Sequence, residues 1–182
     1  MHIKKILLAV ALGCGAMTAQ ADVLSKSALH LRNEFISSGA NQCADAMAET
    51  MQFLSENRPF DEQRQWSTTA PNANPIVVDF VVAGNETAYS RAGSVSLVPA
   101  GGKCRGEYTY TQTEPASNCG DFIKKEGFDG PDWKTVLTGL NGDGGKSYFL
   151  SVLNKPNLTI ILNDVAGGCS LIKREELDMD KQ

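Results

Sequence analysis

Carboxylates are the side chains through which this sequence could perform catalysis. The acids that we consider are Asp79, Glu107, Glu114, Asp129 and Asp132. Two carboxyl groups on either side of a glycosidic bond can act as acid and base. Asp79 is the most informative, since a carboxylate inside the apolar run of residues 76–82 must find a partner or reach a cleft. One hypothesis is therefore a small glycan or peptidoglycan hydrolase with a carboxylate pair drawn from Asp79, Asp129 and Asp132.

Other catalytic and ligand-binding patterns are incomplete. Of the two histidines, only His30 lies beyond the N-terminal segment discussed next. Residues 145–147 read Gly-Lys-Ser, like the end of a phosphate-binding loop, but Leu140 stands where that motif needs its first glycine. No serine lies in a G-x-S-x-G motif. We therefore expect no cofactor and no metal site, and we favour a non-enzymatic protein over an enzyme.

The first 21 residues have the pattern of a secretory signal peptide. Two lysines precede an apolar run over residues 6–16, and small residues follow up to Ala21. The run is too short to span a bilayer, so we expect cleavage after Ala21 and an exported chain of residues 22–182. The short signal with paired lysines favours a bacterial periplasmic or secreted protein. Lipidation at Cys14 is a minor alternative, because Leu12 stands one place too late for a lipobox.

Composition excludes several classes of partner. The sequence has 182 residues, with 17 Lys and Arg against 21 Asp and Glu, for a net charge of −4. Removal of the signal takes away two lysines and leaves 161 residues with a charge of −6. A nucleic-acid-binding protein needs a cationic face to displace counterions, and no basic stripe is present. We expect no nucleic-acid partner, no transmembrane segment and one globular domain.

Four cysteines remain after residue 21, and they predict two disulfides. They are Cys43, Cys104, Cys119 and Cys169, and none forms a C-x-x-C motif. An even number in an exported chain indicates a disulfide framework, and four cysteines allow three pairings. The preferred pairing joins Cys104 to Cys119 across a short excursion, and Cys43 to Cys169.

Apolar periodicity predicts helices at the N-terminus and again in the second half. Helical stripes run over residues 24–35 and 43–54, which gives two helices or one helix kinked near Gly39. Residues 121–126 predict a short helix. A second short helix is predicted over residues 132–137, with Asp132 as its N-cap. The polar stretch of residues 62–75 predicts a long surface connection.

The remaining apolar runs predict strands. These cover residues 76–82, 94–98, 108–111, 148–153, 158–162 and 169–172. The order of elements is that of an α+β protein, with an antiparallel sheet of about five to seven strands and the N-terminal helix or kinked helix pair packed on one face. Residues 173–182 are predicted as a flexible tail. Diglycines precede both Cys104 and Cys169, which we interpret as turn chemistry rather than as an internal repeat.

These observations favour a binding module of the bacterial envelope, of the inhibitor, immunity or assembly-accessory type. Such a protein acts by surface complementarity and recognises a protein or a cell-wall component. The predicted contact residues are Trp66, the segment from Phe128 to Trp133, and the acids Asp79, Asp129 and Asp132. The oligomeric state stays open at this point.

Overall fold

The protein is described here from a computed structural model, over residues 24–84, 89–114, 118–140, 145–153, 155–166 and 168–180. The predicted signal peptide and Cys14 lie outside these residues. The helices are α1 (Lys26–Ser37), α2 (Ala44–Ser55) and α3 (Cys119–Lys125). The strands are β1 (Asp61–Gln65), β2 (Ile76–Val82), β3 (Arg91–Ala100), β4 (Lys103–Glu114), β5 (Trp133–Leu140), β6 (Lys146–Val152), β7 (Lys155–Val165) and β8 (Gly168–Asp180).

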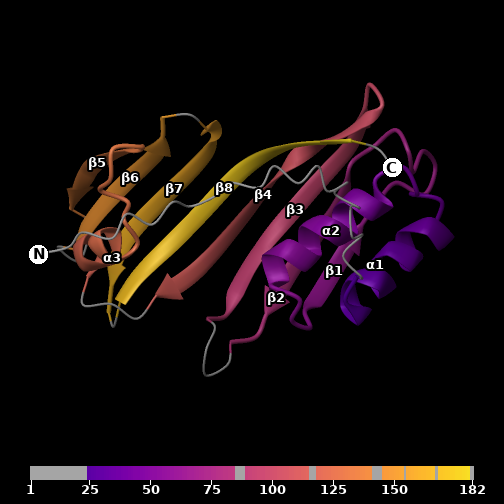
Figure 1. Ribbon diagram of the computed structural model, residues 1–182. Helices are drawn as coiled ribbons and strands as arrows, with labels where there is room; N and C mark the ends of the chain where they lie inside the picture. The colour runs from indigo at the N-terminus through magenta and orange to yellow at the C-terminus, as the bar shows by residue number, and fades with distance from the viewer. Residues whose placement is uncertain are drawn as a thin grey trace, which may run out of the picture.

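All eight of these strands belong to one antiparallel sheet, in the order β1-β2-β3-β4-β8-β7-β6-β5 (Figure 1). Strands β4 and β8 lie at its centre and pair over twelve positions, from Lys103 opposite Asp180 to Glu114 opposite Cys169. Strands β1 and β5 form the two edges. The α+β class and the antiparallel sheet are therefore confirmed, but the sheet has eight strands rather than five to seven.

The N-terminal helices form where apolar residues recur at helical spacing. The side chain of Ser25 caps α1 by accepting a hydrogen bond from the backbone N–H of Ala28. The predicted break near Gly39 separates two distinct helices, and Gly39 has φ 86°, in the region that favours glycine. Leu31 and Phe35 of α1 and Met47 of α2 are fully buried against the sheet.

The chain consists of two halves with the same architecture. In the first half, α2 is followed by the meander β1 to β4; in the second, α3 is followed by β5 to β8. Each half has its own cluster of buried apolar residues. Pairs of buried residues recur 65 positions apart in the sequence, at Val95 and Ile160, Leu97 and Leu162, and Cys104 and Cys169. Gly101 and Gly102 form the turn between β3 and β4 with positive φ, which agrees with the interpretation as turn chemistry, and the buried pairs are what carry the repeat.

The disulfides follow the same repeat. Cys43 at the N-cap of α2 bonds Cys104, and Cys119 at the start of α3 bonds Cys169. Each bond joins the N-terminal end of a helix to the second residue of the last strand in its half. Two disulfides are thus confirmed, but the preferred pairing is wrong. Cys104 stands at the beginning of β4 and Cys119 follows its end, and a strand of this length separates them by about 30 Å, whereas a disulfide needs Cα atoms within about 7 Å.

Three further expectations are corrected. Residues 132–137 do not form a helix with Asp132 as its N-cap, because Trp133–Leu140 is strand β5, paired with β6. The stretch of residues 62–75 is not a connection throughout, since its first part belongs to β1. Residues 173–180 are not a tail: they form the second part of β8 and pair with β4.

Candidate binding surface

One face of the sheet is covered by helices and the other is open. In β2, Ile76, Val78, Phe80 and Val82 are buried beneath the helices, whereas the alternate residues point to the other side. Both helical layers lie on the same face of the sheet. The β4–β8 register places Cys104 under α2 and Cys169 under α3 on the same side. No described side chain on the opposite face is fully buried. We call this second side the open face.

An apolar patch lies on the open face of the second half. Phe149 of β6 stands opposite Ile161 of β7, and Ile161 stands opposite Ile172 of β8, so that the three side chains form one row across adjacent strands. Phe149 is 38% exposed, and the two isoleucines are half-buried. We refer to these three residues as the Phe149 patch.

Polar residues, of which one is charged, border the Phe149 patch along the strands. On one side lie Ser151, Thr159 and Arg174, and on the other lie Ser147, Asn163 and Ser170. The Ser147 hydroxyl donates a hydrogen bond of 2.8 Å to the side-chain oxygen of Asn163. An apolar centre with a polar border is the usual composition of a protein-binding surface.

The internal repeat supplies a reference for this patch. The equivalent positions 65 residues earlier are Ser96 for Ile161 and Glu107 for Ile172, and Ser96 and Glu107 also stand opposite each other across two strands. Buried positions of the two halves keep similar side chains, as at Val95 and Ile160. The same architecture therefore forms in the first half with Ser96 and Glu107 at these positions, so the core does not require isoleucine at either of them.

The aromatic residues predicted as contact residues lie at the borders of the two cores. Trp66 packs against the first core, with its ring edge-on to Phe35 at 5.8 Å between centroids. Phe128 and Trp133 pack together at 4.5 Å beside the second core. All three are partly buried rather than freely exposed. Sequence reasoning thus found aromatic residues that stabilise the fold and missed Phe149.

The predicted acids lie far apart. Asp79 lies on the open face of β2, where the Gln65 amide approaches its carboxylate at 3.5 Å. Asp129 and Asp132 are exposed in the connection before β5. Six strand spacings separate β2 from β5, which corresponds to about 29 Å. The structure does not bring Asp79 together with the other two carboxylates.

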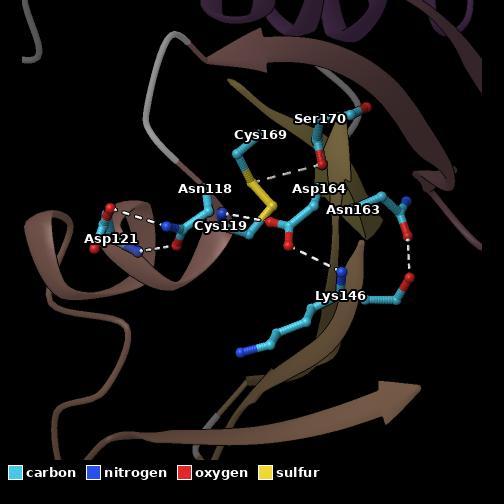
Figure 2. The surroundings of a disulfide bond; sticks show 9 residues. Asn118, Cys119, Asp121, Lys146, Asn163, Asp164, Cys169 and Ser170 are labelled. Carbon is cyan, nitrogen blue, oxygen red and sulfur yellow. Dashed lines mark hydrogen bonds between the residues drawn. A yellow bond between two sulfur atoms is a disulfide. The ribbon is translucent and has the colours of Figure 1, made fainter. Parts of the chain in front are cut away.

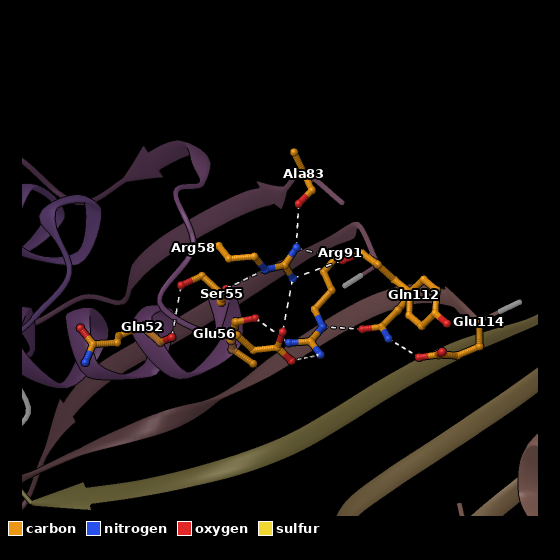
Figure 3. Close-up of polar contacts among 10 residues, drawn as sticks. Gln52, Ser55, Glu56, Arg58, Ala83, Arg91, Gln112 and Glu114 are labelled. Atoms are coloured by element: carbon orange, nitrogen blue, oxygen red, sulfur yellow. Dashed lines mark hydrogen bonds and ion pairs between the residues drawn. The ribbon is translucent and has the colours of Figure 1, made fainter. Parts of the chain in front are cut away.

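Among the acids weighed for catalysis, Glu114 has the most unusual environment. It lies at the end of β4 on the helix-covered side and is 8% exposed. Burial raises the pKa of its carboxyl above the ordinary value, although the hydrogen bond from Gln112 partly opposes this shift. Gln112 in turn accepts a hydrogen bond from Arg91, which forms an ion pair of 2.6 Å with Glu56 at the end of α2 (Figure 3). These contacts join α2 to β3 and β4 within the first half, on the helix side of the sheet.

Two stacked tyrosines occupy the same central region. The rings of Tyr108 and Tyr110 lie 6.1 Å apart, and burial raises the pKa of both phenols. The Tyr108 hydroxyl donates a hydrogen bond to Glu175, whose strand neighbour Lys173 lies over the Tyr108 ring at 5.4 Å. The alternation of tyrosine and threonine in β4 is thus a core pattern, with the tyrosines towards the helices.

A carboxylate fixes the second disulfide region. Asp164 accepts hydrogen bonds from the backbone N–H groups of Cys119, at 2.7 Å, and Lys146, at 2.9 Å (Figure 2). Asn118 caps α3 by accepting from the N–H of Asp121. The start of α3 is therefore attached to the sheet by both a covalent bond and a charged hydrogen bond.

Comparison with known proteins does not extend this description: no protein-family model matches the chain, and neither a curated protein nor a solved structure is similar to it at a significant level. Over the described residues, no group of three or more His, Cys, Asp or Glu side chains could hold a metal ion. No helix in the described part of the chain has the length and hydropathy needed to cross a membrane.

Proposed function

We propose that this protein is an exported, non-enzymatic binding module of the bacterial envelope that recognises a protein partner through the Phe149 patch. Its two disulfides support a location in the periplasm or outside the cell. One observation carries the choice of surface. At open-face positions where the first half has Ser96 and Glu107, the second half has Ile161 and Ile172. A partly exposed apolar row that the fold does not need is the kind of surface that binds a partner.

The composition of the patch favours a protein over a cell-wall glycan. Aliphatic side chains flank Phe149, and the bordering groups are hydroxyls, one amide and the guanidinium of Arg174, which is already paired with Glu107. Sugars require many directed hydrogen bonds to satisfy their hydroxyls, whereas apolar side chains of a protein are buried by such a row. A cell-wall component is therefore the alternative outcome of the test below.

The test is capture from native envelope extract on the immobilised, oxidised protein, followed by mass spectrometry and affinity measurement. Phe149→Ala should weaken the binding of the captured partner. At 38% exposure the ring presents about 75 Å² of apolar surface, or about 2 kcal/mol on burial, which corresponds to roughly 30-fold in Kd.

Two variants make the result specific. Phe53→Ala on α2 removes a ring that is 65% exposed on the helix side, and it should leave binding unchanged. The double variant Ile161→Ser, Ile172→Glu introduces the residues of the first half and should fold but not bind. Equal capture by wild type and double variant, or capture of glycan alone, would contradict the proposal.

A further inference from the structure

The two edges of the sheet are chemically different. Strand β1 has three charged residues among five, Asp61, Glu62 and Arg64, and Arg64 forms an ion pair of 3.2 Å with Glu34 of α1. Strand β5 has one charge among eight residues, Lys134. Charged side chains on an edge strand oppose pairing with another chain. By this criterion β1 is protected and β5 is available.

The backbone of β5 offers hydrogen-bonding groups to solvent. The N–H of Leu153 donates to the carbonyl oxygen of Asp132 at 3.0 Å, so the Asp132 carbonyl points towards β6. Along a strand, the N–H and C=O groups of successive residues point alternately to one neighbouring strand and to the other. Since Asp132 points towards β6, the N–H and C=O groups of Thr135, three residues on, point away from it. The backbone of Trp133 also points away from β6, since its N–H donates a hydrogen bond to the carbonyl oxygen of Gly130. The N–H and C=O of Thr135 therefore lie on the free edge.

The Phe149 patch is one strand away from this edge. Phe149 stands on β6, and β6 is the only strand to which β5 is paired in the described sheet. A strand added to β5 would lie beside the patch, where a partner's side chains could reach it. Such strand addition obtains affinity from main-chain hydrogen bonds and specificity from neighbouring side-chain contacts.

We propose that the free edge of β5 binds an extended segment of the partner protein as a ninth strand. This inference rests on the proposed function and specifies its mode. Charge complementarity selects the occupant: Asp129 and Asp132 are exposed just before β5, so the segment carries Lys or Arg at that end. A second copy of the chain is disfavoured, because each copy has an expected charge of −6.

Replacement of one edge amide tests this proposal. Thr135→Pro removes the N–H at the free edge and leaves the bonds between β5 and β6 in place. The partner purified by capture on wild-type protein should bind this variant at least about tenfold more weakly. Thr135→Val is the matched control, because it removes the hydroxyl that donates to the Phe128 carbonyl at 2.9 Å but retains the N–H. It should bind as wild type.

The outcomes separate the two proposals. If Thr135→Pro binds normally while Phe149→Ala does not, strand addition is wrong and the patch stands. If Thr135→Pro fails to fold, hydrogen exchange of the wild-type complex decides: a protected Thr135 amide supports the proposal, and an unprotected one overturns it. Sedimentation that shows a wild-type dimer, abolished by Thr135→Pro, would overturn it in favour of self-pairing. If no protein is captured, the proposed function itself fails.

Discussion

Removal of either disulfide should destabilise the protein by a similar amount. The bonds close loops of 61 and 50 residues. In the chain-entropy treatment, loop length enters logarithmically, so each bond contributes about 4 kcal/mol through the unfolded state. That is a large part of the 5–15 kcal/mol typical of a domain. The variants Cys43→Ala with Cys104→Ala, and Cys119→Ala with Cys169→Ala, should therefore each lose about 4 kcal/mol of unfolding free energy.

Urea denaturation measures these losses, and thiol titration checks the pairing in the same samples. Each double variant should contain no free thiol after unfolding, because both partners of one bond have been removed. The pairing preferred from sequence would instead leave Cys119 and Cys169 unpaired in the first variant. Two free thiols there, or a loss below about 1 kcal/mol in either variant, would refute the argument. Reduced wild-type protein is the control that keeps every sulfur atom.

Three smaller changes test other parts of the fold by urea denaturation. Glu114→Gln should stabilise the protein at neutral pH, because burial raises the pKa of the Glu114 carboxyl and the folded wild type loses stability as the pH rises from the ordinary pKa of a glutamate through the raised one. The gain in unfolding free energy should vanish near pH 4, where the wild-type carboxyl is protonated too. Gly106→Ala should cost about 3 kcal/mol, since the new Cβ would lie 1.8 Å from the backbone oxygen of Ser96. Asp164→Ala should cost about 2 kcal/mol, as two backbone N–H groups lose their charged acceptor.

The elements with strong periodicity could be predicted from sequence. The helical stripes and the run of residues 76–82 correspond to α1, α2 and β2. The two missed strands are the edges, where the usual signal is weak. Strand β1 is polar at every position, and β5 begins with a tryptophan directly after Asp132, a pattern that also suits a helix start. Pairing with β6 decides the structure of β5, and that contact is not local.

The candidate surface could not be found by a search for isolated aromatic residues. Trp66 and Trp133 attract attention because polar residues surround them in sequence, yet their rings pack against the cores. Phe149 lies in an apolar strand and resembles a core residue until the register places it on the open face. A signal was nevertheless present. Alignment of the sequence with itself at a spacing of 65 would have matched Val95 with Ile160 and Leu97 with Leu162.

The repeat also separates what folding requires from what binding requires. Two halves with one architecture need the same buried residues, and positions such as Leu97 and Leu162 retain them. Open-face positions face water in both halves, so folding alone gives no reason for Ser96 to correspond to Ile161. The same comparison applies to the edges, where charged β1 corresponds to nearly uncharged β5. Both differences place apolar or unprotected surface in the second half. A partner that contacts the Phe149 patch and the β5 edge together would account for both, whereas a purely structural role would account for neither.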